Sequence, residues 1–377
     1  MKSEIEIVPL SRSPREVSRF LQVSYTVYRG DPCWVAPVLM DAKTVFSDRN
    51  PLFEHAEMRL WVARREGRDV GRIAGILDHH HNQRQHDSAA FFGFFETLND
   101  APVATRLFEA VVAWAKAQGA RRVLGPMNPT TNDECGLLVE GFDSPPALMM
   151  TYNPPYYADL VRAAGFRKVK DLLAFYIDLA QSPRARLERI AARSVQRLAD
   201  LRIRPIRRKT LHQDLNRIKE VYNGAWEQNW GFVPMTDGEI DFMAQRLKPL
   251  LAERLVYLAE TATEPAAFLL ALPDYNEAFQ PLRGRLLTPG LFRALPYFLG
   301  WKRPRLVRLL ALGIKPKFRK RGLEAAMIAE GLKFAAEAGF GACEASWILE
   351  DNLLVQRLIG IFGGRAYKTY RLYERDL

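Results

Sequence analysis

Residues 306–327, with the sequence LVRLLALGIKPKFRKRGLEAAM, contain the pattern that decides the fold of this chain. An apolar run that begins at Leu306 predicts a strand, and apolar residues at helical spacing from Leu323 predict a helix that ends near Gly339. The loop between them, Lys317–Gly322, is rich in cations. A helix start exposes unpaired N–H groups, and a glycine lets the main chain approach a ligand closely. The loop therefore predicts an anion site, and a pyrophosphate is the ligand that we expect there.

This strand, loop and helix resemble the coenzyme A loop of the GCN5-related N-acetyltransferase (GNAT) superfamily, whose pattern is Arg/Gln-x-x-Gly-x-Gly/Ala. Arg319 and Gly322 match that pattern, whereas Glu324 stands where the superfamily has a small residue. Asn352 and Gly363 also fall at positions that the superfamily favours. The resemblance implies acyl-CoA as co-substrate. The cofactor-binding residues that it implies are Ile314, Lys317, Arg319, Lys320, Arg321, Gly322, Leu323 and Asn352.

The chain also looks like a diverged internal duplication. The expected elements are strands at 60–63, 70–76, 89–96 and 123–125 with a helix at 103–119, and then strands at 255–259, 266–272, 306–312 and 342–349 with a helix at 323–339. We therefore expect an α/β fold of two tandem GNAT-like domains, 1–180 and 181–377, each with a central mixed β-sheet flanked by helices. The second domain carries a basic, apolar insertion at 280–305.

Only the second of these domains is expected to hold the cofactor. Residues 97–102 connect strand and helix in the first half, and they contain neither an Arg-x-x-Gly loop nor a cluster of cations. The first domain is expected to supply scaffold and one wall of the acceptor site. The Ser182-Pro183 pair is the expected boundary, since proline resists strand continuation and can start a helix.

Composition places the chain among ordinary globular proteins. It has 377 residues, 48% of them hydrophobic and 26% charged, and three cysteines that form no disulfide framework. No apolar run is long enough to span a bilayer, and the N-terminus lacks a signal-peptide core. We expect a cytoplasmic protein, with peripheral contact at the inner membrane face as an extension of that expectation.

The net charge of +11 is concentrated in one interval, because no Asp or Glu occurs between Glu277 and Glu324. Within it, basic residues alternate with aromatic and aliphatic ones over 280–301. Two interpretations stay open. One is contact with an anionic membrane surface or a lipid-like ligand, and the other is a packed insertion with a solvated basic face. No nucleic-acid partner is expected, because no recognisable binding module accompanies the charge.

Acyl transfer to an amine needs a base, a donor that polarises the thioester, and a proton source for the thiolate. Glu344, inside a predicted strand, is the candidate base, with a surface-facing strand residue as the alternative. Asn352 is a second catalytic candidate and also suits a helix cap. The superfamily's proton-donating tyrosine is replaced by Ile359. Tyr373, or its neighbour Tyr370, is the candidate substitute, with packing in the strand as the alternative.

Polar loops at strand and helix ends supply the candidates for acceptor binding. They are Asn132, Asp133, Glu134, Tyr152, Glu227, Trp230 and Trp347. For the first of these loops, a network of turns is the alternative interpretation. Consecutive histidines at 79–81 rarely point at one centre, so we expect no metal.

Three sequence blocks extend the resemblance over nearly the whole chain. They are 132–136, 152–157 and 346–352, and they resemble bacterial tandem GNAT-like proteins related to the bacterial ceramide synthases. The resemblance implies transfer of a fatty acyl group to a long-chain amine such as a sphingoid base. Acetylation of a small polar amine or peptide, and acyl-CoA binding without catalysis, remain as alternatives. The oligomeric state is not set by the sequence.

Overall fold

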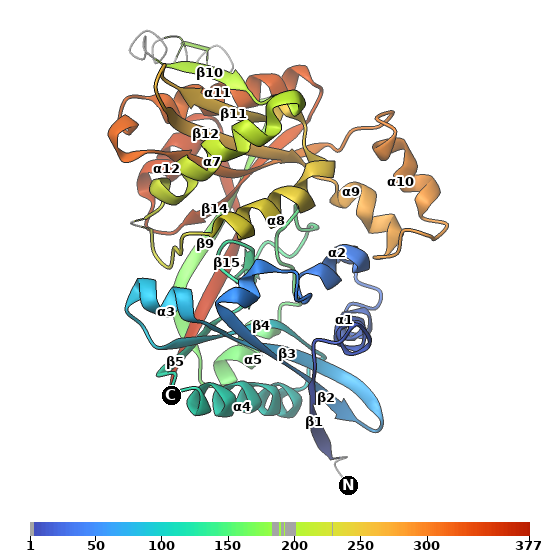
Figure 1. Ribbon diagram of the computed structural model, residues 1–377. Coiled ribbons are helices and arrows are strands. Elements are labelled where there is room, and N and C mark those ends of the chain that lie inside the picture. Colours follow the sequence, from blue (N-terminus) through green and yellow to red (C-terminus); the bar gives the residue numbers. More distant parts are fainter. Residues whose placement is uncertain (1–3, 183–187, 190–191, 193–200, 228) are drawn as a thin grey trace. The chain divides into compact units, whose positions relative to one another are not determined.

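The computed structural model describes residues 4–182, 188–189, 192, 201–227 and 229–377. The chain divides into two compact units (Figure 1). The first contains the residues up to Leu172 together with Phe279–Leu291 and Lys368–Leu377, and the second contains Leu173–Ala278 and Phe292–Tyr367. Of the expected boundary pair, Pro183 lies outside the described residues.

The first unit contains every element from β1 to the beginning of β9. In chain order they are β1 (Ile5–Leu10), α1 (Pro14–Val27), α2 (Leu39–Thr44), η1 (Pro51–Glu54), β2 (Ala56–Arg65), β3 (Arg68–Asp78), α3 (His79–Gln85), β4 (Ala89–Thr97), α4 (Ala101–Ala117), β5 (Arg122–Gly125), β6 (Met127–Asn128), β7 (Glu134–Cys135), β8 (Leu137–Glu140), α5 (Tyr157–Ala163) and β9 (Arg167–Asp178). The short helix η5 (Gln280–Leu282) and most of the last strand, β15 (Arg365–Asp376), also belong to it.

A mixed sheet in the order β1-β2-β3-β4-β5-β15 forms the centre of the first unit, and β8 also pairs with β15. Only β4 and β5 are parallel there among the pairs described, and α4 connects them. The helix buries Val103, Leu107 and Val111 against the sheet, as its apolar spacing predicts. Figure 1 shows α4 along one face of the sheet and α1 along the other.

The second unit repeats this plan with other elements. They are β10 (Arg202–Pro205), η2 (Arg208–Thr210), α7 (Leu211–Ala225), α8 (Asp237–Leu247), η3 (Lys248–Leu250), η4 (Glu253–Leu255), β11 (Val256–Glu260), β12 (Pro265–Pro273), α9 (Asn276–Phe279), α10 (Leu291–Phe298), β13 (Leu306–Ile314), η6 (Pro316–Phe318), α11 (Leu323–Glu337), β14 (Ala342–Leu349) and α12 (Leu353–Ile361). Its strands follow the order β14-β13-β12-β11-β10. β13 and β14 are parallel and are connected by α11, whereas the other neighbours are antiparallel.

Alternation along the strands gives this second sheet two apolar faces. On β11, Tyr257 and Ala259 lie in the core that α11 covers. Val256 and Leu258 point the other way, into the core that α7 covers. The central strands are therefore buried on both faces, which is why they read as continuous apolar runs.

The predicted fold class is confirmed: both units are mixed sheets flanked by helices. The expected ranges 1–180 and 181–377 match the units over most of the chain. They differ for 173–180, which lies in the second unit, and for 279–291 and 368–377, which lie in the first unit. For the last segment the reason is strand pairing, since β15 pairs with β5 and β8 there. Within the described ranges, every helix is too short or too polar to span a bilayer.

Candidate active site

The loop between β13 and α11 leaves a helix start open. Gly322 precedes α11 with a φ of 85°, and no side chain forms a capping hydrogen bond there. Glycine suits this left-handed conformation, and Lys320 adopts it as well with a φ of 61°. The buried side chain of Leu323 anchors the first turn in the core. The first N–H groups of the helix are thus free of a side-chain cap, as an anion site requires.

The cations of this loop divide into bracing and exposed groups. Arg319 braces the loop, because its guanidinium donates to the carbonyl oxygens of Ile314 at 3.2 Å and of Ala225 at 2.5 Å. Lys317 forms an ion pair with Glu264 in the turn between β11 and β12. Lys320 and Arg321 are exposed, and no ion pair involves them in the described part of the chain. They are the cations that remain for a phosphate ligand.

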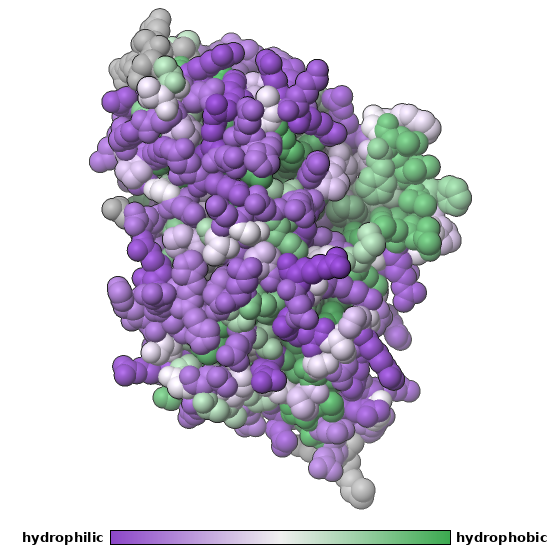
Figure 2. Space-filling model, in the orientation of Figure 1, coloured by the Kyte–Doolittle hydropathy of each residue, from purple (hydrophilic) through white to green (hydrophobic). Residues whose placement is uncertain are grey.

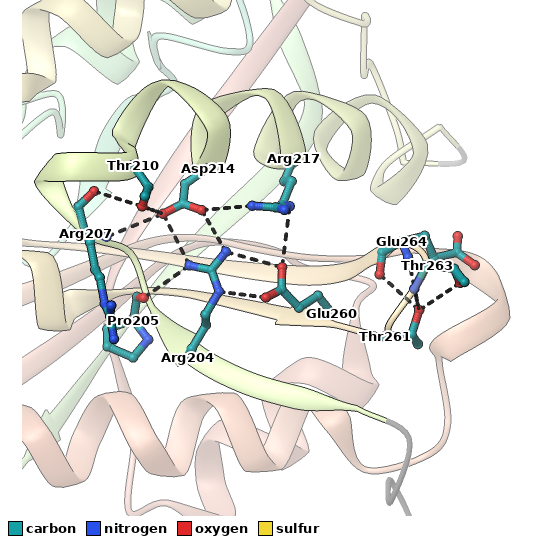
Figure 3. Close-up of polar contacts among 10 residues, drawn as sticks. All are labelled: Arg204, Pro205, Arg207, Thr210, Asp214, Arg217, Glu260, Thr261, Thr263 and Glu264. Carbon is teal, nitrogen blue, oxygen red and sulfur yellow. Dashed lines mark hydrogen bonds and ion pairs between the residues drawn. The ribbon is translucent and has the colours of Figure 1, made fainter.

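Helix α7 is fixed at both ends. At its end, Ala225 accepts the Arg319 hydrogen bond described above. Near its start, Arg204 of β10 donates to Asp214 at 2.7 Å and to Glu260 at 2.7 Å (Figure 3). Burial alone would raise the pKa of Asp214, but hydrogen bonds from Arg204 and Thr210 outweigh it and the pKa is lowered. This charged network holds α7 in place beside the sheet and so steadies the loop.

Strands β13 and β14 diverge beside this loop. They pair only from Leu306 opposite Ala342 to Leu309 opposite Ala345, although β13 continues to Ile314 and β14 to Leu349. Main-chain groups on the facing edges beyond the last pair are therefore placed to bind a ligand. Apart from the buried Ser346, the first side chains beyond the last pair are apolar and half-buried, and they are Leu310, Ala311, Leu312, Trp347, Ile348 and Leu349.

Glu344 lies directly before the point of divergence, and its carboxylate is fully buried. It accepts hydrogen bonds from the Ser346 hydroxyl at 2.7 Å and from the Tyr367 hydroxyl. Arg308, its neighbour across the strand pair, brings its Nε to 3.8 Å from the carboxylate and donates to Ser346 at 3.0 Å. The predicted alternative of a surface-facing strand residue is therefore wrong for Glu344. A buried carboxylate with hydroxyl donors is an arrangement that can pass protons.

Trp347 is the next side chain after this network. Its ring centroid lies 5.5 Å from the Arg308 guanidinium. Its indole N–H is buried and has no acceptor among the described residues. A buried donor without an acceptor is costly unless a ligand satisfies it. Of the predicted acceptor-binding residues, Trp347 is thus the one placed at the divergence.

The other predicted catalytic residues have structural contacts, and their catalytic roles stay predictions. Asn352 caps α12, accepting from the Val355 N–H at 3.3 Å, which is the structural role that its residue type suits. Ile359 is buried in the core of the second unit. Tyr373 is buried in the core of the first unit, in register with Gly125, and burial raises the pKa of its hydroxyl. Tyr370 is likewise fully buried.

The predicted polar loop of the first unit is a turn in a two-stranded ribbon. Asn128 of β6 pairs with Glu134 of β7, and the Thr130 hydroxyl donates to Asp133 at 2.8 Å. The Asn132 N–H donates to the same hydroxyl at 3.1 Å. This is the network of turns that residues of this type favour. A binding role for Asn132, Asp133 and Glu134 stays a prediction.

The remaining predicted acceptor residues lie in two places. Tyr152 donates to Asp31 at 2.9 Å, and burial together with that carboxylate raises the pKa of its hydroxyl. Glu227 and Trp230 follow α7 in the second unit, the former exposed and the latter half-buried. Their role in binding also stays a prediction.

The histidines belong to local structure. Asp78 accepts from the His55 ring at 2.9 Å and caps α3. His81 is buried against Phe91, with the ring centroids 4.8 Å apart. Among the described residues, no group of three or more His, Cys, Asp or Glu side chains is placed to hold a metal ion.

Tyr367, Ser346 and Arg308 were not predicted as site residues. The sequence could have indicated Arg308 and Glu344 as partners, because each is the one charged residue in its strand. A buried lone charge needs a partner, and pairing the two strands supplies one. Tyr367 carried no such signal, since its contact with Glu344 depends on the course of β15.

Comparison with known proteins places the whole chain in one family, although no family model matches it. It is 34% identical over 383 aligned positions to a bacterial ceramide synthase from Caulobacter vibrioides, covering 100% of this chain and 98% of that protein. It is 33% identical to the protein YghO of Escherichia coli, covering 96% of this chain and 93% of that protein.

Solved structures give the fold. A tandem GNAT protein from the clavulanic acid biosynthesis pathway matches with a TM-score of 0.59 at 12% identity, over 99% of this chain and 98% of that one. A GCN5-related N-acetyltransferase from Sphaerobacter thermophilus matches with a TM-score of 0.52 at 14% identity, over 98% of this chain and 95% of that one. The chain therefore belongs to the family of tandem GNAT-fold acyltransferases related to bacterial ceramide synthase.

Proposed function

We propose that this protein is an acyl-CoA-dependent N-acyltransferase that transfers a fatty acyl group to a long-chain amine such as a sphingoid base. The observation that carries the proposal is the divergence of β13 and β14. One strand leads to the uncapped start of α11, and the other carries the buried Glu344 where the divergence begins. In this proposal, the phosphate-binding element and the proton acceptor are thus carried by the two strands that diverge.

In this proposal the start of α11 binds the pyrophosphate of coenzyme A. Main-chain N–H groups after Gly322 donate to the phosphate oxygens, and the exposed Lys320 and Arg321 add positive charge. Arg319 acts as a positioning residue, because its guanidinium already serves the carbonyls of Ile314 and Ala225. Glu324 in the first turn of α11 opposes this binding and lowers the affinity that the loop attains.

The thioester lies at the divergence, with its carbonyl oxygen near unpaired N–H groups of the strand edges. The amine nitrogen attacks the carbonyl carbon, the new C–N bond forms, and the C–S bond breaks to release a thiolate. Tyr367 takes the proton that the nitrogen loses and passes its own to Glu344, to which its hydroxyl already donates. Solvent protonates the thiolate and recovers the proton from Glu344. Tyr367 is needed because Glu344 is itself fully buried.

The preference for a long acyl group is supported by the apolar, half-buried side chains beyond the last strand pair. Burying each methylene contributes about 0.8 kcal/mol, so this lining favours a palmitoyl over an acetyl donor strongly. The relative that is named a bacterial ceramide synthase, at 34% identity, gives independent support for a lipid amine as acceptor.

The test is release of free coenzyme A by the purified protein. Palmitoyl-CoA and acetyl-CoA are each supplied with and without sphinganine, and the E344Q variant is the matched control. Release that needs both palmitoyl-CoA and sphinganine, and that E344Q loses, is the expected result.

Release with acetyl-CoA and a small polar amine instead would make the protein an acetyltransferase and would reject the lipid acceptor. If no pair gives release, thermal unfolding with and without palmitoyl-CoA separates the remaining cases. A ligand that binds only the folded state at about 100 times its Kd stabilises it by about 2.7 kcal/mol. Stabilisation without release would identify a binding protein without catalysis.

A further inference from the structure

The apolar side of α10 faces solvent. Phe292, Leu295, Phe298, Leu299 and Trp301 form what we call the α10 surface. These five side chains are between 38% and 81% exposed. Figure 2 shows hydrophobic side chains gathered over this helix. Folded proteins seldom leave so many large apolar side chains exposed together without a partner.

The helix is docked by its opposite side, so the exposure is a feature of the fold. Ala294 and Tyr297 are buried, and the Tyr297 hydroxyl donates to Glu277 at 3.2 Å. The Nζ of Lys302 lies 4.6 Å from the centroid of the same ring. Residues at positions 292, 295 and 299 follow the three- and four-residue spacing of a single helical face. One face of α10 is thus fixed to the second unit while the other presents aromatic and leucine side chains outward.

Apart from Glu277, which accepts from the Tyr297 hydroxyl on the docked side of the helix, the charges that this segment itself carries are all positive. Arg293, Lys302, Arg303 and Arg305 are exposed, and the sequence has no acidic residue from 278 to 323. Basic residues beside exposed Phe, Leu and Trp match the boundary of an anionic bilayer, where apolar side chains enter the acyl region and cations meet the headgroups. A second copy of this chain fits less well, since it would bring the same cations face to face.

We propose that the α10 surface docks this protein on anionic phospholipid membranes. The proposal rests on exposure and charge alone and does not depend on the acyltransferase assignment. Docking at an anionic bilayer accounts for the apolar face and for the absence of acidic residues at once.

The first experiment measures co-sedimentation of the full chain with vesicles of phosphatidylcholine alone and of phosphatidylcholine with phosphatidylglycerol. We expect binding to the anionic vesicles that falls as salt is raised. The double variant F292S/W301S removes two apolar anchors, and we expect about a tenfold loss or more for each. The control L353S/L354S removes side chains that are 56% and 71% exposed on α12, and it should bind as wild type does.

A second pair of variants tests the charges. R293Q/K302Q removes two cations beside the α10 surface, and we expect roughly a fivefold loss for each on anionic vesicles. R106Q/R121Q removes the same charge from exposed positions of the first unit and should have little effect. Absence of vesicle binding by wild type, or equal binding by F292S/W301S, would overturn the proposal. A dimer in light scattering that F292S/W301S dissolves would overturn it too, by assigning the α10 surface to a second copy.

Discussion

The two units begin their crossover helices in opposite ways. In the first, α4 starts at Asp100, whose carboxylate accepts from the Val103 N–H at 3.2 Å and forms an ion pair with Arg65. In the second, α11 starts at Gly322 with no side-chain cap and with exposed cations nearby. The same structural position therefore carries its own anion in one unit, and in the other it has no side-chain cap, as the proposed binding of an external anion requires.

The two units also differ in what lies beside the parallel strands that each of these helices connects. In the first unit, β4 and β5 pair only from Ala89–Phe91, and β6 then fills the space beside β4. The Asn128 side chain accepts from the Phe94 N–H at 2.6 Å, and a Cβ at Gly93 would lie 1.7 Å from the Met127 carbonyl oxygen. In the second unit, among the pairs described, no strand pairs with the facing edges of β13 and β14 beyond Leu309 and Ala345. The first unit thus fills this place with its own chain, and our proposal assigns the matching place in the second unit to a ligand.

The largest effect is expected from a comparison of two glutamates that accept from tyrosine hydroxyls, Glu344 in the second unit and Glu96 in the first. Glu344→Gln should lower turnover by about 10²–10⁴-fold, because it removes the proton acceptor. Glu96→Gln is the matched change in the first unit, where Glu96 also accepts from two tyrosine hydroxyls. It should leave turnover per folded molecule unchanged. Coenzyme A release by variants with wild-type circular dichroism measures both, and equal turnover of E344Q and wild type would reject the assignment.

The next largest effect is expected for a substitution at Gly322, at the start of α11. Gly322→Asp gives α11 the kind of acidic start that α4 has, and we expect coenzyme A affinity to fall by about tenfold or more. Gly339→Asp is the control for backbone strain, since Gly339 has the same φ of 85° at the far end of α11. Calorimetric titration gives both affinities. A similar loss in G322D and G339D would assign the effect to strain instead of to the anion site.

A substitution at Asn128 in the first unit should change the free energy of unfolding and leave turnover unchanged. Asn128→Ala leaves the Phe94 N–H without its acceptor and should cost about 1 to 2 kcal/mol in the free energy of unfolding. Asn352→Ala removes a helix cap in the second unit at a cost of about 1 kcal/mol, and as a predicted site residue it should also lower turnover. Urea unfolding and the release assay, run on both variants, measure the contrast. A loss of turnover in folded N128A would show that the first unit shapes the site.

The smallest effect concerns the pH dependence of stability. Burial raises the pKa of Glu96 above its ordinary value of 4.5, although Arg72 at 3.5 Å and the two tyrosines oppose the shift. The stability that this group contributes is therefore full below 4.5 and is lost as the pH rises through the raised value. Because glutamine does not titrate, E96Q should gain stability relative to wild type over that window. Urea unfolding at a series of pH values tests this, and a constant difference would contradict it.

Local patterns in the sequence were enough for the central strands of both sheets, for the helices α4 and α11, and for the loop before α11. The apolar spacing from Leu323 predicted α11, and the Lys317–Gly322 loop was placed correctly before its first turn. Tyr373 illustrates what local patterns miss, because its register with Gly125 assigns it to the first unit. Tyr367, six residues earlier on the same strand, lies in the second unit and reaches Glu344. Strand pairing decides which part of β15 belongs to which unit. The residues next to it in the sequence do not indicate that pairing.

Strands β9 and β15 make the two units inseparable as fragments. A polypeptide of residues 181–377 would lack Phe175, Ile177 and Leu179, which belong to the core of the second unit. It would also keep residues 368–377, whose partner strands β5 and β8 lie in the missing half. Such a fragment exposes both a hole in its core and an unpaired strand, and both promote aggregation. Biochemical dissection, and any recombination that shuffles domains, must therefore treat this tandem protein as one inherited piece.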